Sequence, residues 1–339
     1  MSRRSLLFTA AMSGALHAFS PTFASGQSAP KESVAGSTPG KLKIAVFSKH
    51  LQWVSIAEAA AIAKEIGFDG IDLTVRSGGH VEPARVQQDL PAAVEAIHKA
   101  GLEIPMITTD INSATMPHAE IILKTAGQLG IDRYRWGGLK YQPNQPIATQ
   151  LENLKPKMLA LAELNRQAQV CGMYHTHSGP GMIGASIWDV WLLFRDLDPK
   201  WIGINYDIGH ATVEGGYGGW IASAKLVKDY MRGICLKDFL WERNPKFATH
   251  ADSNDKSLEG AYVPGWCAIG EGMVNFPGFF EIVKANSFSG PVQLHFEYPG
   301  LGGAEDGHKT LTIPRKQVID TMRTDLNAVR GYMKKQSLI

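Results

Sequence analysis

Histidines and carboxylates gather at the ends of short apolar segments in this sequence. The histidines concerned are His50, His80, His175, His177, His210 and His295. Neutral imidazole and carboxylate are ligands of divalent transition metals such as Mn, Co, Zn and Fe. His175 and His177 would share one face of a strand, because side chains on a strand alternate with a period of two. Asp207 and His210 are three residues apart and can both reach one ion. We therefore expect a metal centre built on His175, Asp207 and Glu297.

The elements that position these residues are apolar segments alternating with longer amphipathic ones from Lys43 onward. Strands are predicted at 44–48, 70–74, 103–107, 133–136, 172–175, 203–206, 233–236 and 292–296. Helices are predicted at 55–66, 90–100, 119–129, 147–169, 186–197, 220–230, 276–285 and 314–334. Strands that alternate with such helices indicate a parallel sheet, and eight pairs predict a single-domain α/β fold, the (β/α)8 TIM barrel.

In such a barrel the chemistry lies at the C-terminal ends of the strands, which is where the metal-binding candidates fall. A doubly wound sheet is the structural alternative. It would carry a glycine-rich loop after its first strand, but the sequence there reads Ser48-Lys49-His50-Leu51-Gln52-Trp53. The longest irregular stretch, 240–268, is predicted to be a loop over the barrel mouth.

The N-terminus has the pattern of an export signal. Arg3 and Arg4 precede an apolar run that ends in Thr22-Phe23-Ala24, which is typical of a twin-arginine-type signal peptide over 1–24. A flexible linker rich in Ser, Gly and Pro is predicted over 25–42, followed by the barrel domain over 43–339. We expect a periplasmic or otherwise extracytoplasmic protein.

Composition excludes several classes of protein. The formal charge is +2 over 339 residues and falls to 0 when the two arginines of the leader are removed, which argues against a nucleic-acid partner. Three cysteines are too few for a disulfide-dense scaffold. No segment of the barrel approaches the ~20 apolar residues of a membrane span, so stable membrane insertion is not expected. The sequence leaves a homo-oligomer open.

Four motifs carry a resemblance to a known family. They are Asp207-Ile208-Gly209-His210-Ala211, Leu236-Lys237-Asp238, Ile269-Gly270-Glu271-Gly272 with Asn275-Phe276, and Phe296-Glu297. From about Lys43 to its end the chain resembles the xylose isomerase-like TIM barrels, the sugar phosphate isomerase/epimerase family that also includes the type IV AP endonucleases (AP endonuclease family 2 superfamily).

The resemblance implies one divalent metal ion (Mn, Co, Zn, Fe or Mg) and two departures from the family's ligand set. The epimerases hold their metal with Glu, Asp, His and Glu on strands five to eight. The Asp matches Asp207 and the last Glu matches Glu297, but the first Glu is His175 and the His is Cys235. We therefore expect the ligands His175, Asp207, Glu297 and Cys235, with His177 or a loop histidine as the alternative to Cys235.

The implied activity is isomerisation or epimerisation of a sugar or keto-sugar by proton abstraction beside a metal-polarised carbonyl. Glu297 is the expected base, assisted by His210 or His175. Because His175 replaces one of the two family glutamates, elimination by a lyase or hydratase acting on 3-keto-glycosides is the main alternative. Substrate contacts are expected from Trp53, His177 and the cations Arg76 and Lys237, which suit anionic or hydroxyl groups; a Lys237–Asp238 pair is the structural alternative for that lysine.

Two other classes of function remain open at this stage. A phosphodiesterase of the AP endonuclease kind would need further Asp and His ligands before Ile269, where the sequence reads Pro264-Gly265-Trp266-Cys267-Ala268. A barrel that binds sugar without catalysis would follow if the altered site held no metal.

Overall fold

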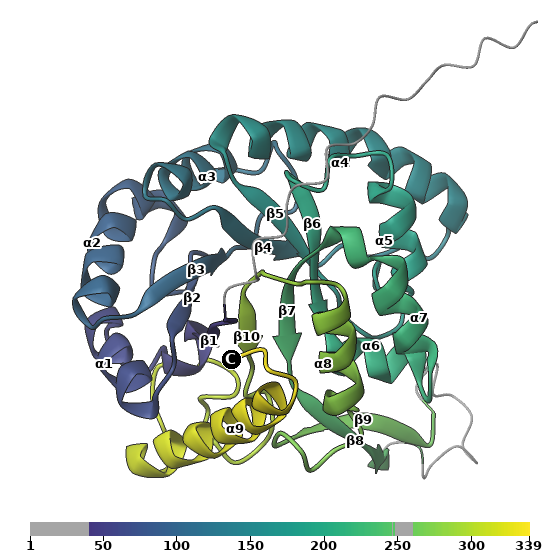
Figure 1. Ribbon diagram of the computed structural model, residues 1–339. Coiled ribbons are helices and arrows are strands. Elements are labelled where there is room, and N and C mark those ends of the chain that lie inside the picture. Colours follow the sequence, from purple (N-terminus) through teal and green to yellow (C-terminus); the bar gives the residue numbers. More distant parts are fainter. Residues whose placement is uncertain (1–40, 246, 248–259) are drawn as a thin grey trace, which may run out of the picture. The chain divides into compact units, whose positions relative to one another are not determined.

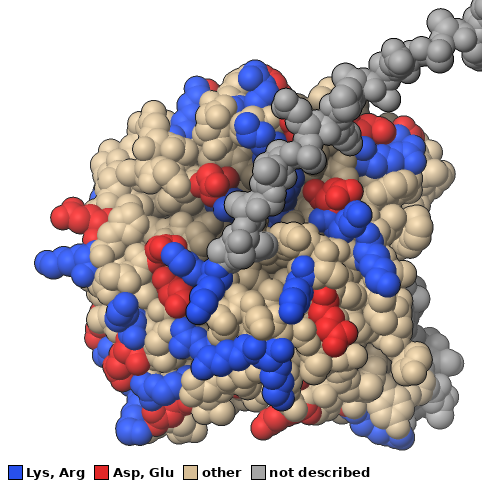
Figure 2. Space-filling view, in the orientation of Figure 1, with Lys and Arg blue, Asp and Glu red and all other residues tan. Residues whose placement is uncertain are grey.

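The chain folds as a closed barrel of eight parallel strands surrounded by helices (Figure 1). This computed structural model describes residues 41–245, 247 and 260–339. The predicted signal peptide (1–24) and nearly all of the predicted linker (25–42) lie outside the described residues. Within the described part, none of the helices is long and apolar enough to cross a membrane. On the face shown in Figure 2, cationic and anionic side chains are interspersed.

The barrel strands are paired in the order β1-β10-β7-β6-β5-β4-β3-β2, and β1 and β2 close the ring. Their bounds are β1 Ile44–Phe47, β2 Gly70–Thr74, β3 Glu103–Thr108, β4 Arg133–Gly137, β5 Cys171–His175, β6 Ile202–Asp207, β7 Met231–Leu236 and β10 Val292–Leu294. All eight predicted strands are therefore present, and the predicted TIM barrel is confirmed. The last strand ends two residues earlier than expected, so His295 and Glu297 follow it.

Helices pack outside the strands and cover their apolar faces (Figure 1). Their bounds are α1 Ile56–Ile66, α2 Val86–Lys99, α3 Ala119–Gln128, α4 Ile147–Ala168, α5 Ile187–Phe194, α6 Ile208–Gly215, α7 Gly219–Leu226, α8 Phe276–Ala285 and α9 Arg315–Lys335. Helix α1 shows how local sequence sets these limits. Ser55 caps its start by accepting from the Glu58 amide at 3.3 Å, and Gly67 ends it with a φ of 111°.

Two regions differ from the sequence expectation. The helix α6 directly follows β6, where the sequence predicts no helix before residue 220. The predicted loop at 240–268 contains an antiparallel ribbon of β8 (Asp238–Arg243) and β9 (Tyr262–Cys267). The two strands pair with each other, from Asp238 with Cys267 to Arg243 with Tyr262, so their backbone hydrogen bonds do not depend on the barrel.

Asp238 fixes this ribbon beside the barrel. Its carboxylate accepts hydrogen bonds from the amides of Phe239, Gly270, Gly272 and Val274 at 2.9–3.0 Å. A Cβ on Gly272 would lie 2.3 Å from Asp238 Oδ1, so the turn has room only for glycine there. The Lys-Asp and Ile-Gly-Glu-Gly motifs thus meet in space, and Asp238 is occupied by backbone amides rather than by Lys237.

Candidate active site

Four buried side chains converge where the barrel strands end. His175, Asp207, Cys235 and His295 each offer a ligand atom, and these atoms all lie within 4.8 Å of one another. They come from the ends of β5, β6 and β7 and from the residue after β10. A second group, formed by His175, His177 and His210, shares His175 with the first and meets the same criterion. The barrel therefore unites three of the four predicted metal ligands and adds His295.

The two oxygens of Asp207 have separate environments. Oδ1 caps helix α6 by accepting from the His210 amide at 3.0 Å. Oδ2 is buried and has no hydrogen-bond partner; it faces His175 Nε2 at 3.5 Å and Lys237 Nζ at 3.6 Å. Because Oδ1 is held by the helix start, Oδ2 is presented to the centre of the cluster.

The donor set of this cluster fits a divalent metal. Both ring nitrogens of His295 are buried without a hydrogen-bond partner, as is Asp207 Oδ2, and such orphaned polar atoms are rare in native proteins. Two imidazoles, a carboxylate and a cysteine form a mixed N, O and S set that suits zinc, iron or cobalt better than magnesium. The structure thus contains a candidate metal site, while the metal itself is not identified.

The imidazoles of the site are held neutral. Burial, followed by the charge of nearby Arg135, lowers the pKa of His175 well below its usual value. Burial likewise lowers the pKa of His210 and of His295 well below theirs, and that of His177 to about 3. Neutral imidazole is the form that binds metal or accepts a proton.

Behind His175 a chain of buried polar groups crosses the barrel interior. The Asn205 amide nitrogen lies 3.0 Å from His175 Nδ1 and donates to Gln293 Oε1 at 2.5 Å. Gln293 Nε2 donates in turn to Asp72 Oδ2 at 2.6 Å, and Thr108 Oγ1 donates to the same carboxyl at 2.8 Å. This chain fixes the orientation of the His175 ring, with Nε2 toward Asp207.

Glu297 lies outside both groups of potential ligands. Its Oε1 accepts from Lys49 at 3.0 Å and its Oε2 from Lys237 at 2.8 Å. Burial alone would raise the pKa of Glu297, but the charges of Lys237 and Lys49 outweigh it and hold the pKa well below its usual value. Glu297 is therefore an ionised carboxylate at the barrel mouth.

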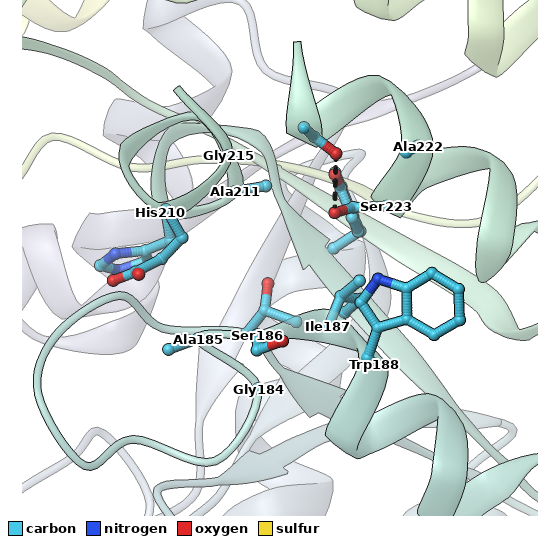
Figure 3. A pocket seen from close by; sticks show the side chains of 14 residues that line it. Gly184, Ala185, Ser186, Ile187, Trp188, His210, Ala211, Gly215, Ala222 and Ser223 are labelled. Atoms are coloured by element: carbon cyan, nitrogen blue, oxygen red, sulfur yellow. Dashed lines mark hydrogen bonds between the residues drawn. The ribbon is translucent and has the colours of Figure 1, made fainter. Parts of the chain in front are cut away.

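Lys237 links Glu297 to the histidines. Its Nζ donates to His210 Nε2 at 2.7 Å and lies 4.0 Å from the centre of the Trp266 ring, which belongs to β9. Because His210 Nε2 accepts from Lys237, the proton of the neutral ring is on Nδ1, which donates to Ser178 Oγ at 2.7 Å. His210 also borders a pocket of about 280 Å³ that Ser186, Trp188 and Ser223 help to line (Figure 3).

The other predicted substrate-binding residues are His177, Trp53 and Arg76. His177 belongs to the second histidine group, with its Nδ1 buried and unpartnered. Trp53 is half-buried; it donates to the His50 carbonyl at 2.9 Å and stacks under Arg315. Arg76 lies beside the Phe47 ring, 5.4 Å from its centre.

Four residues of the site were missed as site residues by sequence reasoning, namely Lys49, Arg135, Asn205 and Gln293. Arg135 could have been identified from the sequence, because a charged side chain within the predicted strand at 133–136 is unusual for a barrel interior. Asn205 and Gln293 could have been identified in the same way, because each is a polar side chain within a buried strand.

A family model for the xylose isomerase-like TIM barrel matches residues 60–313, so the chain belongs to this family. No curated protein sequence matches it significantly. Solved structures with the same fold include D-allulose 3-epimerase from Methylomonas sp. in complex with D-allulose, at 15% identity and a TM-score of 0.59, covering 87% of this chain and 99% of that one.

Two further solved structures are similar over comparable lengths. The 3-keto-D-glucoside 4-epimerase of E. coli is 13% identical, with a TM-score of 0.59, covering 86% of this chain and 100% of that one. The probable 3-DHS dehydratase of petrobactin synthesis from Bacillus anthracis is 14% identical, with a TM-score of 0.59, covering 85% and 99%. At such identities the likeness shows the fold alone.

Proposed function

We propose that this protein is a metal-dependent sugar isomerase or epimerase that abstracts a proton beside a carbonyl. One observation carries the proposal: an ionised glutamate, Glu297, is joined through Lys237 to a buried set of metal-ligand side chains. Family membership and the sugar epimerases that share the fold support it.

The proposed metal ligands are His175, Asp207, Cys235 and His295. This set keeps three of the residues expected from sequence and replaces Glu297 by His295, because both oxygens of Glu297 are engaged by lysines. A divalent ion held there would polarise the carbonyl or neighbouring hydroxyl oxygen of a sugar and acidify the adjacent C–H.

The chain's own groups would then move the proton. Glu297 is the proposed base, already ionised at neutral pH. Lys237 holds its carboxylate in place and bears a positive charge suited to a developing oxyanion. His210, hydrogen-bonded to Lys237 and Ser178, is the proposed relay for returning a proton to the substrate: it would receive a proton from the Lys237 ammonium at Nε2 and give up the one on Nδ1.

Elimination from a keto-sugar is the second candidate. The family's two epimerase glutamates act on opposite substrate faces, but His175 occupies one of those positions and is anchored by Asn205. A single carboxylate base with Lys237 and His210 beside it suits removal of a proton and protonation of a leaving group. A dehydratase shares the fold.

Solvent exchange tests the proposed function. The purified chain, loaded with Zn²⁺, Mn²⁺ or Co²⁺, would be incubated in D2O with ketoses and 3-keto-glucosides and followed by NMR. We expect deuterium beside the carbonyl, lost on adding a chelator, and an unsaturated product if elimination occurs. Sugar binding without exchange under any metal would instead indicate a non-catalytic sugar-binding barrel.

We also propose that the protein is exported to the periplasm through residues 1–24. The support is the Arg3-Arg4 pair, the apolar run and the Thr22-Phe23-Ala24 ending.

A further inference from the structure

Two arginine side chains lie against the same aromatic ring, that of Phe47, at the barrel mouth. Arg76 follows β2 and Arg135 lies in β4, and their guanidinium carbons are 5.4 Å and 5.3 Å from the centre of the Phe47 ring. Burial, and then the positive charge of Arg135, lowers the pKa of Arg76 from its usual value. The fold thus brings two like charges together, which is unfavourable unless an anion lies nearby.

None of the ion pairs within 4.0 Å among the described residues involves Arg76 or Arg135, although the charges of Asp110, Asp72 and Glu297 act on Arg76 from further away. The carboxyl of Asp72 is occupied by Thr108 and Gln293, and that of Glu297 by two lysines. Arg135 Nη1 is buried and has no hydrogen-bond partner. Its Nη2 has only a long contact of 3.5 Å with His177 Nε2. A buried N–H of a cation that lacks an acceptor is costly and indicates a missing partner.

This arginine pair adjoins the candidate metal site. The Phe47 ring stacks on His295, with 4.7 Å between ring centres. Arg135 contacts His177, whose ring centre is 4.5 Å from that of His175. An anionic group between Arg76 and Arg135 would therefore lie on a molecule that also reaches the metal ligands and Glu297.

We propose that Arg76 and Arg135 bind an anionic group of the substrate, a carboxylate or a phosphate, so that the sugar acted upon is acidic. That the bound molecule is the substrate rests on the proposed function. Guanidinium groups present N–H donors in a planar fork that matches both kinds of oxyanion. Contact with the Phe47 ring holds the two guanidinium groups in place. The N–H groups of Arg135 are then available to donate hydrogen bonds to the ligand.

Binding measurements on the full barrel, with and without Zn²⁺, test this subsite. The probes are D-glucuronate, D-glucose 6-phosphate and neutral D-glucose, and the variants are Arg76→Gln and Arg135→Gln. Arg133→Gln is the matched control, because Arg133 lies on the same strand but pairs with Asp132 at 3.1 Å. We expect at least one acidic sugar to bind more tightly than glucose. Each test variant should weaken that binding by about tenfold to a hundredfold, as loss of a charge-assisted hydrogen bond does, while the control leaves it unchanged.

The outcomes separate the subsite from the proposed function. A preference for glucuronate identifies a carboxylate, and a preference for glucose 6-phosphate identifies a phosphate. Equal binding of all three sugars, or acidic binding that needs Zn²⁺ and ignores both arginine variants, overturns the subsite. Solvent exchange on an acidic keto-sugar that persists at the parental rate in both variants would also reject it while leaving the isomerase proposal intact. Arginine-dependent binding of an acidic sugar without exchange would support the subsite and reject the isomerase.

Discussion

Lys237 donates a hydrogen bond to Glu297 at 2.8 Å, and the same ammonium group lies 3.6 Å from Asp207. Its charge therefore bridges the glutamate at the mouth and the carboxylate of the buried cluster. Burial opposes the charge of Lys237, but the negative charges of Asp207 and Glu297 raise its pKa above the usual value. The Lys237 ammonium group thus remains cationic. The two carboxylates that it contacts, Glu297 at the barrel mouth and Asp207 in the buried cluster, can therefore have different roles.

The proposed role of Glu297 predicts the first result. Glu297→Gln keeps the side-chain size but removes the proposed base, so solvent exchange beside the sugar carbonyl should fall by about 10²–10⁴. The measurement is deuterium incorporation by NMR. Glu281→Gln, an exposed change on α8, serves as the control and should exchange at the parental rate. Exchange by Glu297→Gln at that rate would make His210 the leading base.

The ligand set predicts a second result, in metal content. One divalent ion should bind per chain, and Asp207→Ala or His295→Ala should weaken its binding by about a hundredfold or more, since even loss of a residue that only hydrogen-bonds to a ligand costs about 10–100-fold. Elemental analysis after dialysis measures it, with the exposed His98→Gln as control. Glu297→Gln should retain the metal; if it loses the ion and His295→Ala retains it, then Glu297 is the fourth ligand, as expected from sequence.

The buried Asp72 predicts a pH dependence of stability. Burial raises its pKa to about 7, although hydrogen bonds from Thr108 and the charges of Arg135 and Arg76 oppose the rise. The folded protein therefore binds a proton on Asp72 more tightly than the unfolded chain does. The contribution of this protonation to the free energy of unfolding is complete below about pH 4 and is lost as pH rises to about 7.

Asp72→Asn should remove this loss. The unfolding free energy of the variant, relative to the parent, should rise by up to about 1.4 kcal/mol per pH unit between pH 4 and 7 and stay constant above. Urea titrations at several pH values measure it. Asp132→Asn, an exposed change, should stay within about 0.5 kcal/mol of the parent at each pH. A stability difference for Asp72→Asn that does not vary with pH would show that Asp72 ionises normally.

The proposed export predicts a fourth result, which cell fractionation can measure. Replacing Arg3 and Arg4 by Lys keeps the charge but removes the twin-arginine pattern, so the protein should remain in the cytoplasm. Immunoblots of periplasmic and cytoplasmic fractions measure it. The same change at Arg85, an exposed residue of the barrel, should leave export unaffected. Normal export of the double variant rules out the twin-arginine route.

Much of the fold could be predicted because strand and helix periods are local. The predicted helix at 55–66 matches α1 to within one residue, and the alternation of elements indicated a barrel. Helix α6 was missed because its first residues, Ile208 and Gly209, are poor helix formers, although Asp207 is a favourable cap. The ribbon of β8 and β9 was missed because Pro264 and Gly265 interrupt the strand pattern.

The site was less predictable because its contacts join distant parts of the chain. The positions of His175, Asp207 and Cys235 followed from strand ends, which are set locally. The partners of Glu297 did not, since Lys49 lies 248 residues away and Lys237 60 residues away. His295 was noted at the rim, but the family resemblance drew attention to Glu297, and only the three-dimensional arrangement distinguishes the two.

The pairing of β1 with β10 has a consequence for the order of folding. These strands join Ile44 to Val292, and His50 strengthens the join by contacting the Ala304 carbonyl and accepting from the Phe296 amide, across 254 and 246 residues. The ring therefore cannot close until residues 292–294 have been synthesised, because β10 is the strand that pairs with both β1 and β7. Since His295 and Glu297 follow that strand, the segment that closes the barrel also supplies two residues of the candidate site.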